Sequence, residues 1–445
     1  MITVDSLRRL AMARLEPALA TDPVRRFGRV LRAEGDMLYA TGIAAPIGAR
    51  CLVVGPDEVL RAGEVVGFAS GCLKVLPEQG ARGIQRGARI YVESAAPGLR
   101  VGPALLGRVL DAHGAPLDGL GPPALDSTWP LLGTAINPLH RARIDTKFDS
   151  GVRAVNALTT MGRGMRIGLF AGSGVGKTTL LGMMSRHACA DIVVLGLIGE
   201  RGREIREFIE DQLGPALPRS VVVAAPADAT ALARLHGAYR AAAIAEYFRS
   251  EGKHVLLVVD SLTRLAMAQR EIGLAAGEPP AMRGYPASVF GVISAYVERA
   301  GNAAPPAGSI TALYTVLVEG DDHVADPVAD TARAVLDGHI VLSRALAEAA
   351  IYPPIDITAS LSRPMPALVD ATHLDHAQRF RALWARRAEK QDFIDLGVYA
   401  PGRDALLDEA LQRAPAMAAL LRQDIGTQVS LIDAAATLSA VMAAP

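Results

Sequence analysis

The sequence has few cysteines and few aromatic residues. Its 445 residues include three cysteines, Cys51, Cys72 and Cys189, and 4% of the residues are aromatic. The cysteines lie far apart and form no C-x-x-C pair, which argues against a disulfide framework and against a cysteine zinc site. This cysteine usage indicates a reducing compartment.

The sequence also lacks a long apolar run and an excess of charge of either sign. No apolar stretch approaches the roughly 18 residues that span a bilayer, and Arg14 and Glu16 interrupt what would be the apolar core of a signal peptide. We therefore expect a cytoplasmic protein. Lysines plus arginines equal aspartates plus glutamates, at 46 each, so the composition gives no support for nucleic-acid binding.

The amino-terminal part of the chain has two sections. Residues 1–23 predict an amphipathic helix with Leu7, Leu10 and Leu15 on one face. This helix either packs on its own domain or binds a partner or a membrane surface. Residues 24–95 contain short apolar runs separated by Gly, Pro and Asp turns, which predicts a small β-barrel or sandwich.

The rest of the chain changes to an α/β pattern and then to a helical one. From about residue 135, strands that are apolar throughout alternate with helical stretches rich in Ala and Leu. Such strands are typical of a parallel sheet covered on both faces, so residues 96–365 predict an α/β domain entered through a Gly- and Pro-rich linker. Residues 366–445 predict a helical domain.

The stretch 168-GLFAGSGVGKTTLLGMM-184 carries the clearest functional signal, because a predicted strand runs through a glycine-rich loop into a predicted helix. A phosphate site of this kind needs inward-facing backbone N–H groups and a helix N-terminus beneath the anion. Lys177 would neutralise phosphate charge, and the Thr178 hydroxyl would ligate Mg²⁺. The strict pattern has glycine where Ala171 stands. The predicted nucleotide-binding residues are Gly172, Ser173, Gly174, Val175, Gly176, Lys177, Thr178 and Thr179.

Two carboxylates follow other buried strands. Asp260 ends 255-VLLVVD-260, where it would reach the Mg²⁺ shell from a neighbouring strand. Glu200 ends DIVVLGLIGE and is the candidate to orient and polarise the attacking water in ATP hydrolysis. His373 and His376 lie three residues apart on a predicted helix, and we expect them to be a solvated surface pair rather than a metal site.

Three motifs together, GSGVGKTTLLGMM, GLIGERGREIREFIE and VVDSLTRLAMAQREI, resemble the protein-export ATPases of type III secretion systems, which are relatives of rotary ATP synthase catalytic subunits. The resemblance also includes GEPPAMRGYPASVF, LDGHIVLSRALAEAAIYPPIDITASLSR and LGVYAPGRD, so it covers most of the chain. Alanine is usual at the position of Ala171 in these ATPases. The resemblance implies a small N-terminal β-barrel, a central RecA-like P-loop α/β domain and a C-terminal helical domain.

The resemblance also implies roles for residues that pattern alone leaves unmarked. It implies a homohexamer with ATP sites between subunits, in which Arg363 is the arginine finger that reaches the adjacent subunit's site. Pro364 departs from the family's usual residue and biases Arg363 toward extended backbone. The implied catalytic residues are Lys177, Glu200, Arg201, Arg264 and Arg363, and Tyr352 and Tyr399 would pack against adenine.

The family also implies partners and a location. The loop 277–290 would face a central stalk protein, and the N-terminal helix would bind a stator or regulator protein. Export gate, chaperones and export substrates would be further partners, at the periphery of the inner membrane. AMAQREI, GEPPA and LGVYAPGRDALLDEAL look closest to flagellar members.

Three alternatives to flagellar export stay open. They are an injectisome export ATPase, a rotary ATP synthase-type subunit in a hetero-oligomer, and a hexameric RNA translocase. The acidic loop VEGDDHVADPVAD favours an export enzyme over a synthase subunit. The RNA translocase is disfavoured because residues 24–92 do not interleave aromatic with basic residues.

Overall fold

The computed structural model describes residues 26–94, 98–133, 136–318 and 326–443. The chain forms two compact units, Met1–Pro97 and Gly98–Pro445. The predicted helix over residues 1–23 lies outside the described residues. None of the described helices has the length and apolar character needed to cross a membrane.

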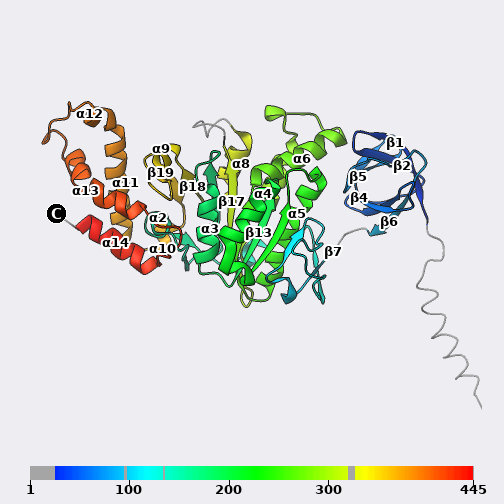
Figure 1. Cartoon of the computed structure of the whole chain (residues 1–445), viewed down its shortest axis with the longest axis horizontal. Helices are drawn as coiled ribbons and strands as arrows, with labels where there is room; N and C mark the ends of the chain where they lie inside the picture. Colours follow the sequence, from blue (N-terminus) through cyan, green and yellow to red (C-terminus); the bar gives the residue numbers. More distant parts are fainter. Residues whose placement is uncertain (1–25, 95–97, 134–135, 319–325, 444–445) are drawn as a thin grey trace, which may run out of the picture. The chain divides into compact units, whose positions relative to one another are not determined.

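The described part of the first unit is a closed barrel of six strands, drawn in blue in Figure 1. The strand order is β1-β2-β5-β4-β3-β6, and neighbouring strands are antiparallel. Closure leaves no unpaired sheet edge, and small apolar side chains such as Val30, Val53 and Val75 fill the interior. This confirms the barrel and rules out the sandwich. The strands are β1 (Gly28–Glu34), β2 (Met37–Thr41), β3 (Arg50–Val54), β4 (Leu60–Ala69), β5 (Cys72–Pro77) and β6 (Arg89–Ser94).

The second unit is built on a sheet with the order β19-β18-β12-β17-β15-β13-β14-β8, to which β16 adds by pairing with β17. Strands β8, β14, β13, β15, β17, β12 and β18 are parallel to one another, whereas β16 and β19 are antiparallel. These strands are β8 (Val109–Asp111), β12 (Arg166–Ala171), β13 (Ile192–Ile198), β14 (Ser220–Ala225), β15 (His254–Asp260), β16 (Gly301–Asn302), β17 (Ser309–Leu317), β18 (Gly338–Leu342) and β19 (Ile355–Ser362). Two small sheets pair β7 (Gly98–Val101) with β9 (Ser127–Pro130) and β10 (Lys147–Phe148) with β11 (Met161–Gly162).

Helices cover the sheet because its strands are apolar on both faces. All seven residues of β13 are buried, as expected for a central parallel strand. The helices of this α/β part are α2 (Arg153–Leu158), α3 (Lys177–His187), α4 (Gly202–Glu207), α5 (Ala231–Ser250), α6 (Leu262–Ala276), α7 (Ala287–Val297), α8 (Pro327–Val335) and α9 (Arg344–Glu348). Short helical turns are η1 (Pro103–Leu105), η2 (Pro138–His140), the π-helix η3 (Phe208–Leu213), η4 (Gly214–Arg219) and η5 (Met282–Gly284).

The carboxyl-terminal helices pack on one end of this unit, in orange and red in Figure 1. They are α10 (Met365–Leu368), α11 (Ala371–Glu389), α12 (Gln391–Asp395), α13 (Ala405–Leu421) and α14 (Leu431–Ala443). Phe380 and Leu383 of α11 belong to the same buried cluster as Ile167 and Leu169 of β12. The predicted boundary near residue 366 thus falls after β19, inside one compact unit.

Candidate nucleotide site

The carboxyl ends of the parallel strands meet at one edge of the sheet and enclose a cavity of about 840 Å³. Ligands of open α/β sheets bind at this edge. The structure brings most of the predicted site residues to it. The predicted residues that line the cavity are Gly172, Ser173, Gly174, Gly176, Lys177, Thr178, Thr179, Glu200, Arg201 and Arg264.

The loop after β12 wraps backward before helix α3 begins at Lys177. Gly174 has a φ of 75° and Gly176 a φ of 98°, a region that side chains other than glycine rarely adopt. Ala171 is the last residue of β12, pairs in parallel register with Leu317, and is fully buried. The backbone of Ala171 has ordinary strand geometry, so glycine is not required at this position. Val175 is also buried, at 4% exposure, and its side chain anchors the loop in the core instead of lining the cavity.

Lys177 holds two carboxylates together at the base of the cavity. Its Nζ donates to Asp260 Oδ1 at 2.6 Å and to Glu200 Oε1 at 3.1 Å. Asp260 Oδ1 also accepts a hydrogen bond from Thr315 Oγ1 at 2.6 Å, from the adjacent strand β17. Asp260 is 5% exposed and does not line the cavity. It reaches the cavity through Lys177.

Burial and charge shift the protonation of these groups. Burial and the nearby negative charge of Asp260 raise the pKa of Glu200 above its ordinary 4.5, and Lys177 offsets only part of this shift. Burial alone would lower the pKa of Lys177, but the attraction of Asp260 and Glu200 outweighs burial and raises it. Lys177 therefore stays an ammonium, whereas Glu200 binds a proton more readily than an exposed glutamate.

The residues present fit an anion and a hard cation. The buried Nε of Arg264 has no hydrogen-bond partner, and Arg264 lines the cavity, so an anion would satisfy it. Arg264 lies in the first turn of α6, where the Oγ of the capping residue Ser261 accepts from its backbone N–H. The Thr178 hydroxyl and the Asp260 carboxylate are oxygen donors of the kind that Mg²⁺ prefers.

Arg201 lines the same cavity but faces solvent. Its side chain is 83% exposed and its Nη1 lies 3.2 Å from Glu204 Oε1. Arg203 and Arg206 continue this exposed row through pairs with Glu207 and Glu210. Among these arginines, only Arg201 lines the cavity.

The two tyrosines predicted to contact adenine lie far apart. Tyr352 is 52% exposed and lies two residues before Pro354, whose ring would be 3.8 Å from a Cβ on Gly176. The carbonyl oxygen of Tyr352 accepts a hydrogen bond from the backbone N–H of Gln423, which lies just after the end of α13. Tyr399 instead donates its hydroxyl to Asp408 Oδ1 at 2.7 Å, near the start of α13.

Tyr399 therefore does not join Tyr352 within this chain. Helix α13 has 17 residues, which at 1.5 Å per residue separates its ends by about 25 Å. Tyr399 lines a separate small cavity with Phe393 and Val398. The expectation that both tyrosines pack on one adenine is therefore corrected, and the contact of Tyr352 with adenine stays a prediction. The sequence motif around Tyr399 did not show which end of α13 it would pack against.

Arg363 lies at the opposite edge of the sheet from the phosphate loop. Its backbone N–H donates to Asp337 O, and the N–H of Asp337 donates to Arg166 O at the start of β12. Strand β12 runs from Arg166 to Ala171, so it places Arg363 about 17 Å along the strand from the loop. Its Nη2 donates to Arg333 O at 3.1 Å. Arg363 does not contact the cavity of its own chain.

Sequence reasoning missed one basic residue at this site. Arg344 lines the cavity beside Val318. It follows the buried strand β18 directly after the capping residue Ser343. A charged residue at the end of an apolar strand is the signal that identified Asp260, and the same signal would have identified Arg344.

His373 and His376 each contact another helix of the second unit. His373 is 7% exposed and its Nε2 lies 2.7 Å from Ala157 O, while His376 Nδ1 lies 3.2 Å from Ser439 Oγ. The expectation of a solvated pair was wrong, because α11 packs His373 against α2 and His376 against α14.

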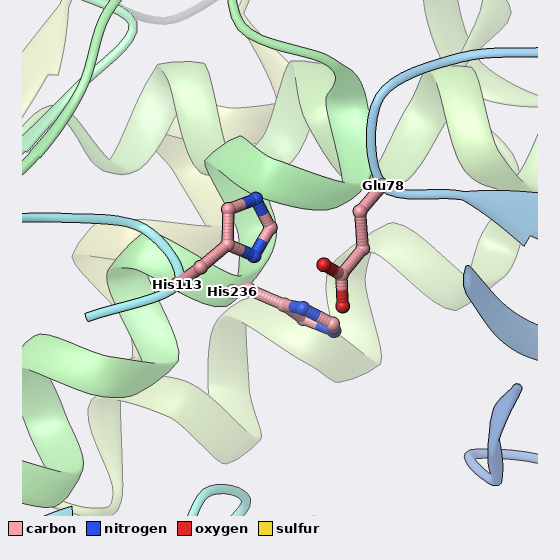
Figure 2. A group of neighbouring side chains, drawn as sticks. All are labelled: Glu78, His113 and His236. Atoms are coloured by element: carbon pink, nitrogen blue, oxygen red, sulfur yellow. The ribbon is translucent and has the colours of Figure 1, made fainter. Parts of the chain in front are cut away.

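Two further histidines lie close together in the second unit. Figure 2 shows His113, in the loop after β8, and His236, on α5, with ring nitrogens within 4.8 Å of each other. The third side chain drawn, Glu78, belongs to the first unit. Two imidazoles are fewer than the three or four protein ligands of a zinc site.

Two family models match the chain. The nucleotide-binding domain of the ATP synthase alpha/beta family matches residues 151–362. The C-terminal domain of the type III secretion ATPase EscN matches residues 369–440. The second match begins close to the start of α11.

Curated relatives and solved structures match nearly the whole chain. The flagellum-specific ATP synthase of Salmonella typhimurium is 53% identical, with 93% of each chain covered. The type 3 secretion system ATPase of Xanthomonas euvesicatoria is 47% identical, with 92% of each covered. The assembled ATPase EscN of enteropathogenic E. coli superposes with a TM-score of 0.88 at 41% identity, covering 93% of this chain and all of the other. EscN in complex with its central stalk EscO gives a TM-score of 0.85 at 40% identity over 93% of this chain.

Proposed function

The chain belongs to the family of flagellum-specific ATP synthases and type III secretion ATPases, and from this premise we propose that it hydrolyses ATP between subunits to energise flagellar protein export. It is an ATPase by this membership. The observation that carries the proposal is Lys177, which joins Glu200 and Asp260 at the base of a glycine-rich loop.

The backbone and side-chain groups of the site have different roles in hydrolysis. The backbone N–H groups of residues 172–179, together with Lys177 and Arg264, bind the phosphates. An incoming phosphate competes for the Lys177 ammonium, and Glu200 is then free to accept a hydrogen bond from the attacking water and orient it. Thr178 and Asp260 would hold Mg²⁺, which neutralises charge on the phosphates when bound.

The position of Arg363 supports a site shared between subunits. Arg363 lies at the opposite sheet edge from its own phosphate loop, so it would serve the site of a neighbouring copy. Repeating one such head-to-tail contact gives a ring when the rotation between neighbouring copies closes. We propose a homohexamer, and the similarity to the assembled EscN supports it.

The partners follow from the exposed loop and from the relatives. Residues 277–286 join α6 to α7, so the predicted loop 277–290 runs into the first turn of α7, and Met282 in this connection is 64% exposed. The similarity to EscN bound to its central stalk supports a stalk protein as the partner of this loop. We further propose that residues 1–23 bind a stator or regulator and that export gate, chaperones and substrates engage the hexamer. The site of action would be cytoplasmic, at the periphery of the inner membrane.

We prefer the flagellar system over the injectisome because the flagellar relatives of Salmonella and Pseudomonas aeruginosa, at 53% and 52% identity, exceed the Xanthomonas secretion relative, whereas that of Bacillus subtilis, at 44%, does not. The Salmonella flagellar relative is 53% identical and the Xanthomonas secretion relative is 47% identical. A rotary synthase-type subunit would need a different, non-catalytic partner chain to form its site. Catalytic assemblies made of this chain alone would therefore exclude that alternative.

The test is phosphate release by the purified full-length chain and by two variants. Glu200→Gln keeps the size of the side chain but removes its negative charge, so we expect ATP binding to remain and hydrolysis to fall at least about 100-fold. Lys177→Ala removes the phosphate-binding ammonium and should abolish turnover. Near-normal turnover by Lys177→Ala, or loss of nucleotide binding by Glu200→Gln, would contradict the assigned roles.

A further inference from the structure

Arg344 is a cation at the nucleotide site without an acidic partner among the described residues. It lines the cavity, and its Nη2 lies 4.0 Å from the point where a Cβ on Gly172 would stand. Within the described ranges, the guanidinium of Arg344 makes no hydrogen bond or ion pair. A guanidinium placed over a phosphate loop without a carboxylate to neutralise it is available to an anionic ligand.

The strand order shows on which side of the loop Arg344 lies. The sheet runs β18-β12-β17-β15-β13 across the site. Glu200 follows β13 and Asp260 ends β15, both on one side of β12. Arg344 follows β18, on the other side. Arg344 and the carboxylate that would orient the attacking water therefore line the same cavity from opposite sides of β12.

Arg344 shares its connection with the proposed adenine contact. The chain between β18 and β19 carries Arg344 at its start and Tyr352 eight residues later. Pro354 of the same connection packs toward Gly176. One segment thus borders the phosphate loop at two points, Gly172 and Gly176, and also carries the proposed adenine contact Tyr352.

We propose that Arg344 binds the diphosphate portion that ATP and ADP share, and so sets nucleotide affinity rather than the rate of hydrolysis. This inference rests on the proposed function, because it assigns a part to a residue of the same site. A planar guanidinium donates two parallel hydrogen bonds to phosphate oxygens, which an ammonium does not. Arg344 is thereby separated in role from Lys177 and Arg264, which lie nearer Glu200.

The test compares Arg344→Gln with the wild-type chain in two measurements. Hydrogen bonds to charged groups contribute about 1.5–3 kcal/mol, so we expect Arg344→Gln to raise the KM for ATP by roughly 10- to 100-fold. The Kd of ADP, measured by calorimetry, should rise by a similar factor. The value of kcat should stay within about two-fold, because an interaction made equally in ground and transition states does not change it.

Controls separate this inference from the proposed function. Arg86→Gln removes an exposed arginine of the barrel and should change neither constant. Arg344→Lys keeps the charge and should give intermediate constants, and it decides the question if Arg344→Gln does not fold. A wild-type chain without ATPase activity would refute the proposed function itself.

Two outcomes in an active enzyme would overturn the inference alone. In the first, Arg344→Gln leaves the KM for ATP and the Kd of ADP at wild-type values. In the second, kcat falls while the Kd of ADP is unchanged, which would place Arg344 at the transferred phosphate.

Discussion

Lys177, Glu200 and Asp260 form a group of one positive and two negative charges, and this imbalance explains how the site responds to a ligand. Both carboxylates depend on one ammonium. Burial, together with the negative charge of Asp260, raises the pKa of the Glu200 carboxyl. A bound phosphate chain would replace the carboxylates as the negative partner of Lys177. The cation bound to the phosphates would replace Lys177 as the positive partner of the carboxylates.

The raised pKa of Glu200 predicts the acid limb of the pH profile. In its proposed role Glu200 acts only when ionised, and a raised pKa means that ionisation is lost at a higher pH as the solution is acidified. The acid limb of kcat/KM, which reports the free enzyme, should therefore lie above the ordinary value of 4.5. Initial rates measured across pH at fixed ionic strength check this. An acid limb at or below 4.5 would show that Glu200 is not the group that titrates.

At the scale of elements, a buried ion pair joins α5 to the chain after α7. Arg299 donates to both carboxylate oxygens of Glu246, at 2.8 and 2.9 Å, and Trp129 Nε1 donates to the same group at 3.1 Å. Glu246 is 2% exposed, and Arg299 Nη1 is buried without a partner. Removal of Glu246 would leave a buried guanidinium without its counter-charge.

We therefore predict that Glu246→Ala destabilises the second unit by about 3–5 kcal/mol. Urea unfolding followed by tryptophan fluorescence measures this, because Trp129 and Trp384, the two tryptophans of the chain, both lie in this unit. The matched control is Glu207→Ala, which breaks an exposed pair with Arg203 and should cost at most about 1 kcal/mol. Equal effects of the two substitutions would contradict the account of the buried pair.

The elements that sequence predicted well are those whose signal is local. Continuous apolar strands such as β13 predicted a covered parallel sheet. Because parallel strands end at one edge of the sheet, the place of Asp260 at the end of an apolar strand predicted that it lies at the nucleotide site. The outcome for Ala171 has a similar local cause, since a strand-end residue with ordinary backbone needs no glycine.

The features that sequence missed depend on how distant elements pack. The position of Tyr399 depends on which end of α13 it contacts, and the burial of His373 depends on α11 lying against α2. No periodicity within one segment reports such contacts. Arg344 is an intermediate case, because its strand-end position was visible but its approach to Gly172 required the neighbouring strands β18 and β12.

At the scale of the whole molecule, one chain holds the phosphate loop and the proposed arginine finger Arg363 at opposite ends of its parallel strands. Tyr352 precedes and Arg363 follows β19, an outermost strand of the sheet. Strand β19 begins beside the carboxyl ends of the parallel strands, where the phosphate loop lies, and finishes beside their amino ends. The single chain thus offers a phosphate loop on one side and the proposed arginine finger on the other. A ring of identical copies brings each finger to a neighbour's loop.

The sharing of one ATP site between two subunits is tested by ATP hydrolysis in mixtures of two inactive variants. Glu200→Gln keeps Arg363, and Arg363→Ala keeps Glu200; each alone should lose activity, by about 10³-fold for the arginine. In co-assembled rings of equal parts, about a quarter of the interfaces would join an intact loop side to an intact finger, since each interface is formed by two different subunits. The account predicts that hydrolysis recovers on co-assembly to a comparable fraction of wild type. Activity that remains at the average of the two separate variants would show that Arg363 does not complete a neighbour's site.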